Sequence, residues 1–76
     1  MSFSEWLQKM RGDTSLRQFS LELGFDPNAV RVWLYHDRIP TGQNLMQICQ
    51  RFASSRGLDA RAIWQEMFEV LGGSRH

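Results

Sequence analysis

The amino-acid sequence predicts an all-α fold in which five short helices form one compact domain. Apolar residues recur at helical spacing along five stretches of the chain, and no stretch has the alternating pattern of a strand. Each stretch follows a residue type that caps helix N-termini and precedes a glycine or proline that ends helices. Because 76 residues are too few for two domains, residues 1–76 are assigned to a single unit.

The first helix is predicted from the spacing of Ser2 and Glu5, which fits a capping box in which each side chain binds the other residue's backbone N–H. We expect this helix to extend to about Met10. Gly12 is expected to end it by taking the left-handed conformation. The apolar stripe of this helix consists of Phe3, Trp6, Leu7 and Met10.

The second helix is predicted over residues 16–23, since Ser15 and Gln18 repeat the capping-box spacing and Gly24 stops the helix. Its expected apolar contacts are Leu16, Phe19, Leu21 and Leu23.

The third helix is predicted to begin at Pro27, because Asp26 is a favourable N-cap and proline is tolerated at the first helical position. Pro40 cannot continue a helix, so residues 36–42 are expected to form a connector. Within this connector Thr41 is the expected cap of the next helix.

The fourth and fifth helices are predicted on either side of a break at residues 54–57. The fourth helix has apolar residues at Leu45, Ile48, Cys49 and Phe52. Leu58 and Asp59 fit a hydrophobic staple and an N-cap for the last helix, at about residues 59–71.

Two short helices joined by a tight glycine-containing turn form a helix-turn-helix unit, and residues 15–36 fit this description. Gly24 permits the positive φ that a sharp turn needs. The small side chain of Ser20 lies where the two helices would cross, and Phe25 is placed to pack beneath the turn.

The third helix has two chemically different faces. Val30, Trp33 and Leu34 share one side and are expected to face the core. The polar face consists of Asn28, Arg31, Val32 and Tyr35, at i, i+3, i+4 and i+7. An asparagine can bind adenine, an arginine can bind guanine or a phosphate, and a valine can contact a thymine methyl group. This face therefore predicts an element that enters the major groove of DNA.

The residues "SLRQFSLELGFDPNAVRVW", "RIP" and "NLMQICQRF" resemble the Cro and phage-repressor class of helix-turn-helix domains, the XRE or lambda-repressor-like family. The resemblance covers roughly residues 14–53 and implies a compact all-α, five-helix DNA-binding domain. Many members of that family have polar base-reading residues where this chain has Pro27 and Val32. We therefore expect either a short sequence code or a reading of the DNA that depends partly on its shape.

The resemblance also implies the residues that contact DNA. Helix N-termini offer free N–H groups to phosphates, which agrees with backbone contacts at the start of the second and fourth helices. The implied base contacts are Pro27, Asn28, Arg31 and Val32, and the implied DNA-backbone contacts are Ser15, Arg17, Tyr35, Arg38 and Thr41.

The last helix has more apolar residues than a domain of this size is expected to bury, and exposed apolar patches usually mark interfaces. We expect a two-fold homodimer through this helix, which would set two recognition helices about one DNA turn apart. The alternative is that this helix only covers the core beside the first helix. The residues expected at the dimer interface are Trp64, Met67, Phe68 and Leu71.

These observations favour a sequence-specific regulator that binds double-stranded DNA, a small phage or mobile-element repressor acting as a homodimer on a palindromic operator. The alternative is a protein-interaction module, an antitoxin-like partner or a phage-encoded inhibitor, that keeps the fold without binding specific DNA. An enzyme is not expected, because no nucleophile–base pair, metal cluster or phosphate-cradling loop is readable. The sequence indicates no cofactor, no metal and no small-molecule ligand.

Composition is consistent with a cytoplasmic protein of a bacterial cell or a phage-infected host. No apolar run is long enough to cross a membrane and no signal peptide is recognisable. The single Cys49 is expected to be a small buried residue, and Arg51, Arg56 and Arg61 are expected to be solubilising charges. A net charge of only +1 predicts modest non-specific affinity for DNA.

Overall fold

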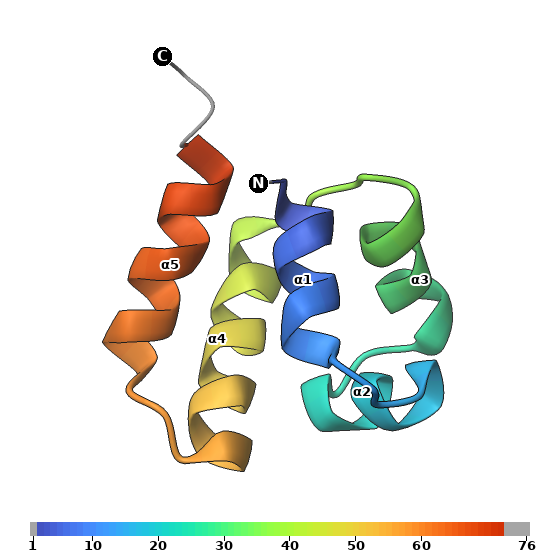
Figure 1. Ribbon diagram of the computed structural model, residues 1–76, viewed down its shortest axis with the longest axis horizontal. Helices are drawn as coiled ribbons and strands as arrows, with labels where there is room; N and C mark the ends of the chain where they lie inside the picture. The colour runs from blue at the N-terminus through green and yellow to red at the C-terminus, as the bar shows by residue number, and fades with distance from the viewer. Residues whose placement is uncertain (1, 73–76) are drawn as a thin grey trace.

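The computed structural model describes residues 2–72, and within this range the secondary structure consists of five α-helices without a strand (Figure 1). The helices are α1 (Phe3–Arg11), α2 (Leu16–Leu23), α3 (Pro27–Tyr35), α4 (Gly42–Arg56) and α5 (Ala60–Gly72). The all-α, five-helix prediction is therefore confirmed for these residues.

The N-terminal caps lie where the sequence predicts them. In α1 the Ser2 N–H donates to Glu5 Oε1 at 2.9 Å, and the Glu5 N–H donates to Ser2 Oγ at 3.2 Å. The bond from the Ser2 backbone is the main cause of the lowered pKa of the Glu5 carboxyl. Ser15, Asp26 and Thr41 cap α2, α3 and α4 with their side-chain oxygens, so each helix begins at the expected residue.

Helix ends agree with the sequence only in part. Gly24 ends α2 in the left-handed conformation, at φ +79° and ψ +27°. Gly12 ends α1 with φ +60° and ψ −129°, so the expectation of a left-handed helical residue there was wrong. The expected break at residues 54–57 was also too early. Helix α4 continues through Arg56 and stops at Gly57, where φ is +64°.

The buried apolar side chains form a single cluster to which all five helices contribute. The Phe52 ring on α4 lies at its centre, stacked on Phe19 at 5.9 Å and edge-on to Trp6 at 6.0 Å. Helix α1 packs against α3 and α5, and α4 packs against α2 and α5. As a result, α3 and α5 lie at opposite edges of the molecule (Figure 1).

Two apolar residues for which the sequence predicts packing contacts lie at the surface. Leu21 on α2 is 65% exposed, because the buried face of this helix runs through Phe19, Ser20 and Leu23. Leu21 lies on the opposite side of that helix. Leu58, the residue expected to form a hydrophobic staple before α5, is 46% exposed.

Helix α5 buries only part of its apolar residues. Ile63 and Met67 are buried, and Leu71 packs partly against the core. Met67 is only 1% exposed and so belongs to the core, which corrects its assignment to an exposed interface. Phe68, at 63% exposure, lies on the outer face of α5, and Trp64, at 37% exposure, lies beside it at the edge that adjoins α4.

Candidate nucleic-acid interface

The turn between α2 and α3 is closed by backbone hydrogen bonds. The Gly24 N–H donates to the carbonyl of Ser20 at 2.8 Å, and the Phe25 N–H donates to the same carbonyl at 3.1 Å. Ser20 is buried, and its hydroxyl donates to the Leu16 carbonyl at 2.7 Å, which satisfies its only polar side-chain group. The Phe25 ring packs edge-on against Trp33 with centroids 4.9 Å apart, so it fills the space beneath the turn as expected.

Helix α4 holds this turn from the other side. The Gln47 side-chain amide donates to the carbonyls of Leu23 at 3.1 Å and Gly24 at 3.5 Å. The last carbonyls of α2 have no partner within the helix, so Gln47 supplies one. Sequence reasoning missed this role because the two groups are 24 residues apart in the chain.

A second tie between α2 and α4 involves Glu22. Its carboxylate accepts hydrogen bonds from Arg56 Nε at 2.8 Å and Nη2 at 3.1 Å, and from the Ser55 hydroxyl at 2.7 Å. The Arg56 guanidinium carbon also lies 4.5 Å above the Phe52 ring centroid. The hydrogen bond from Arg56 is the main cause of the lowered pKa of Glu22. Arg56 therefore stabilises the fold, and the expectation of a merely solubilising charge was wrong.

The inner face of α3 is fixed by packing and by α1. Val30, Trp33 and Leu34 are buried, as the sequence predicts. The Ser4 hydroxyl on α1 donates to the Trp33 carbonyl at 2.6 Å. These contacts determine which residues of α3 face solvent.

The outer face of α3 is open to solvent along most of its length. The side chains expected to read base edges, Asn28, Arg31 and Val32, are all exposed, together with Pro27 at the start of the helix. Helix α3 packs against α1 and α2, whereas α5 lies at the opposite edge and does not cover this face (Figure 1). A flat or grooved partner can therefore reach these side chains.

The residues expected to contact the DNA backbone are also exposed. Ser15 Oγ accepts the Gln18 N–H at 3.2 Å, and Thr41 Oγ1 accepts the Asn44 N–H at 3.4 Å. Both hydroxyls act as acceptors in these caps, so their own hydrogens remain available to a phosphate oxygen. Arg17 on α2 and Arg38 in the connector are exposed cations.

Tyr35 has a neighbour that sequence reasoning did not identify. Arg11 at the end of α1 donates from Nη1 to the Tyr35 hydroxyl at 2.6 Å. The tyrosine hydroxyl thus acts as an acceptor towards Arg11 and keeps its own hydrogen for another acceptor. This contact brings a further positive charge to the end of α3 and adds Arg11 to the candidate interface.

Two carboxylates interrupt the positive charge of this region. Asp26 caps α3, where its Oδ1 accepts the Asn28 N–H at 2.8 Å. Asp37 follows α3 with φ +54°, a conformation that aspartate tolerates better than most residues. Both carboxylates are exposed, and each would repel a phosphate brought close to it.

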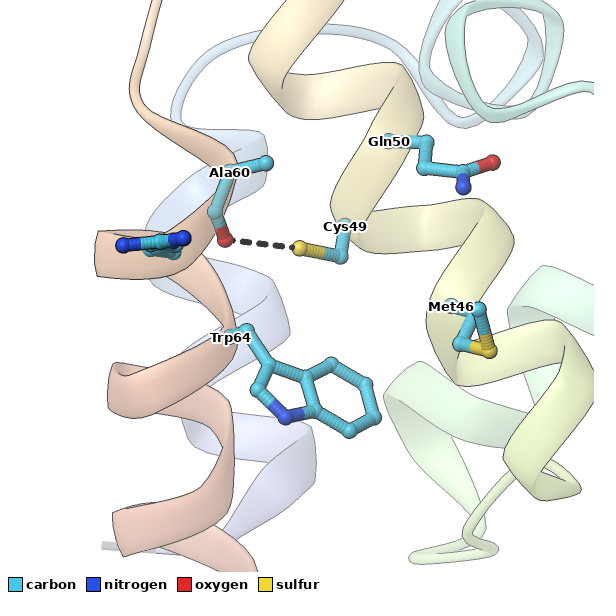
Figure 2. A pocket seen from close by; sticks show the side chains of 6 residues that line it. Met46, Cys49, Gln50, Ala60 and Trp64 are labelled. Carbon is cyan, nitrogen blue, oxygen red and sulfur yellow. Dashed lines mark hydrogen bonds between the residues drawn. The ribbon is translucent and has the colours of Figure 1, made fainter.

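Cys49 lies away from this region, on α4 facing α5 (Figure 2). Its thiol donates to the Ala60 carbonyl at 3.1 Å, and burial raises its pKa. The thiol thus stays protonated at neutral pH and is a weak nucleophile. Among residues 2–72, no three metal-binding side chains lie close enough to hold an ion.

No helix in the described part of the chain has both the length and the apolarity needed to cross a membrane. Comparisons of the sequence and the structure with models of protein families, with curated proteins and with solved structures find no match.

Proposed function

We propose that the protein is a sequence-specific regulator that binds double-stranded DNA through a helix-turn-helix formed by α2, the Gly24 turn and α3. The proposed fold type is that of the lambda-repressor-like domains. The observation that carries the proposal is the division of α3 into two faces. Trp33 and its apolar neighbours are buried, whereas Asn28 and Arg31 are exposed on the side that α5 leaves open.

In this proposal α3 enters the major groove. Asn28 binds the N6 and N7 edge of an adenine, and Arg31 binds O6 and N7 of a guanine. Val32 contacts a thymine methyl group, and Pro27 lies beside the groove wall. The phosphates on either side are bound by Ser15, Arg17, Tyr35, Arg38 and Thr41, with Arg11 as an addition from the structure.

We further propose that the protein acts as a repressor by occupying a promoter as a homodimer. A two-fold dimer presents the same face twice, so its operator is a palindrome with half-sites about one helical turn apart. With two exposed base-reading polar side chains in each copy, sequence-dependent DNA shape contributes to the choice of site.

The test is selection of bound duplexes from a random pool, followed by titration of the selected site with Asn28→Ala and Arg31→Ala. Each variant should weaken specific binding by about 1–3 kcal/mol and relax the preference at one base pair. Lys9→Ala is the matched control, because Lys9 is an exposed cation on α1, whereas the α1 side chains that bond to α3 are those of Ser4, Gln8 and Arg11. A protein that enriches no sequence and binds no duplex at low salt would falsify the proposal.

A second candidate function, a protein-interaction module, is favoured by the exposed aromatic pair Trp64 and Phe68 on α5. The two functions differ in their dependence on salt. Binding to DNA weakens steeply as salt rises, because counterions are released from the phosphates. Binding of a protein partner to the aromatic pair should change little between the same salt concentrations.

A further inference from the structure

One stripe of exposed residues on α5 has opposite charges at its two ends. A shallow hollow along this helix is lined by Arg61, Trp64, Gln65, Phe68 and Glu69. Their spacing places them on one side of the helix. The Trp64 and Phe68 rings meet edge to face, with centroids 5.9 Å apart, and both are exposed. The stripe is therefore cationic at its start, aromatic in the middle and anionic at its end.

The two charged residues of this stripe lie at equal distances from Gln65 and have opposite charges. Arg61 and Glu69 each lie four residues from Gln65, which is about 6 Å along the helix axis. Consider a second α5 that lies antiparallel to the first, with a two-fold axis at Gln65. Each residue before Gln65 is then level with the partner residue that lies the same number of positions after Gln65. Arg61 then faces the partner's Glu69 at both ends of the contact.

A second hollow lies beside this stripe, between α4 and α5. It has a volume of about 420 Å³, and Met46, Cys49, Ala60 and Trp64 contribute to its walls (Figure 2). Its lining is mostly apolar. In the antiparallel arrangement Phe68 lies level with Ala62 of the partner subunit, beside this hollow in the other copy.

We propose that the outer face of α5 binds a second copy of this chain in an antiparallel, two-fold contact centred on Gln65. Arg61 pairs with the partner's Glu69, and Phe68 enters the partner's hollow between α4 and α5. The proposal rests on the homodimer of the proposed function. It replaces Met67, which is buried, and Leu71, which packs partly against the core, with Arg61 and Glu69 at the interface.

Charge complementarity favours a second copy in the antiparallel orientation. A parallel copy would place Arg61 against the partner's Arg61 and Glu69 against the partner's Glu69, which is repulsive. In an antiparallel dimer the pair of Arg61 and the partner's Glu69 forms twice, so each of the four charges faces an opposite charge. This self-complementarity is the property that a two-fold interface requires.

The test is sedimentation equilibrium of the full chain without DNA, comparing the native protein with Arg61→Glu, Glu69→Arg and the double exchange. Each single reversal puts like charges together at both ends and should weaken dimerisation about three- to tenfold. The double exchange restores opposite charges and should recover native association. Both substitutions favour the helix dipole, because glutamate comes near the N-terminus and arginine near the C-terminus, so α5 itself is not weakened.

Phe68→Glu tests the aromatic part of the contact and should weaken dimerisation at least about tenfold. Leu21→Glu is its matched control, since Leu21 is as exposed as Phe68 but lies on α2. This control should dimerise like the native chain. Circular dichroism of both variants checks that the helices remain folded.

Two results overturn the interface: a chain that stays monomeric at all concentrations, or a double exchange as weak as the single reversals. Titration of DNA with the same variants separates this proposal from the proposed function. Binding of a selected duplex by a chain that does not dimerise through α5 overturns the interface alone. Dimerisation with the expected charge dependence, but without any duplex binding, overturns the function and leaves the interface standing.

Discussion

Arg11 and Tyr35 join the end of α1 to the end of α3, with the arginine Nη1 donating to the tyrosine hydroxyl at 2.6 Å. The two residues are 24 positions apart in the chain, and both face solvent at least in part. The contact holds the tyrosine on the outer side of α3 and places a guanidinium next to it. A phosphate at this point would meet a hydroxyl donor and a positive charge together.

We therefore expect Arg11→Ala to weaken DNA binding equally for all sequences. Removing one phosphate contact should reduce the slope of log affinity against log salt by about 0.9. The measurement is a titration of the selected duplex at several salt concentrations. Lys9→Ala removes a charge from the other side of α1 and should leave the slope nearly native. Equal slopes for native protein and Arg11→Ala would show that Arg11 does not contact DNA.

Gly24→Ala should destabilise the fold more than Gly57→Ala. Both glycines have a left-handed conformation, which costs other residues about 1–2 kcal/mol. A Cβ at Gly24 would also lie 3.0 Å from Arg51 Nη2 and 3.1 Å from Gln47 Nε2, whereas one at Gly57 meets nothing within 4 Å. Thermal unfolding should show the larger loss for Gly24→Ala. Equal losses would mean that the side chains of α4 move aside freely.

The Glu22–Arg56 pair should make stability depend on pH in the acid range. The pKa of Glu22 is lowered in the folded protein, mainly by its hydrogen bond from Arg56. The folded state thus favours the ionised carboxylate. This stabilisation is complete above the pKa of an unfolded glutamate and is lost as the pH falls through the lowered pKa of Glu22.

Glu22→Gln is the variant that isolates this effect. It should be less stable than the native chain by about 1 kcal/mol at neutral pH, and the difference should shrink as the solution becomes acidic. Urea unfolding at a series of pH values measures both proteins. A difference that stays constant across the series would contradict an ionic origin.

Met67 and Phe68 are neighbours in the chain with opposite expected effects. Met67→Ala should destabilise the fold by about 2–4 kcal/mol, because a buried side chain is removed and a cavity remains. Phe68→Ala should change the stability of the monomer by less than about 0.5 kcal/mol, since its ring is largely exposed. Thermal unfolding in dilute solution, where the chain is monomeric, measures both. A large loss for Phe68→Ala would indicate that its contact with Trp64 supports α5.

The start of each of the first four helices was determined by the sequence alone. Ser2, Ser15, Asp26 and Thr41 bond to backbone groups two or three residues away, so their effect is local and readable from spacing. The same is true of the Gly24 turn and of the buried and exposed sides of α3. For these reasons the candidate interface on α3 could be predicted before the structure was known.

Tertiary structure decided the remaining features, because they depend on groups that are distant in the chain. Helix α4 continues beyond its expected end as far as Arg56. The side chain of Arg56 binds Glu22, which is 34 residues away in the chain. Packing between α1, α4 and α5 buries Met67, whereas Trp64 and Phe68 remain exposed. The apolar composition of α5 alone does not predict which of these residues is buried. Arg11 joined the candidate interface in the same way, since only folding brings the end of α1 beside Tyr35.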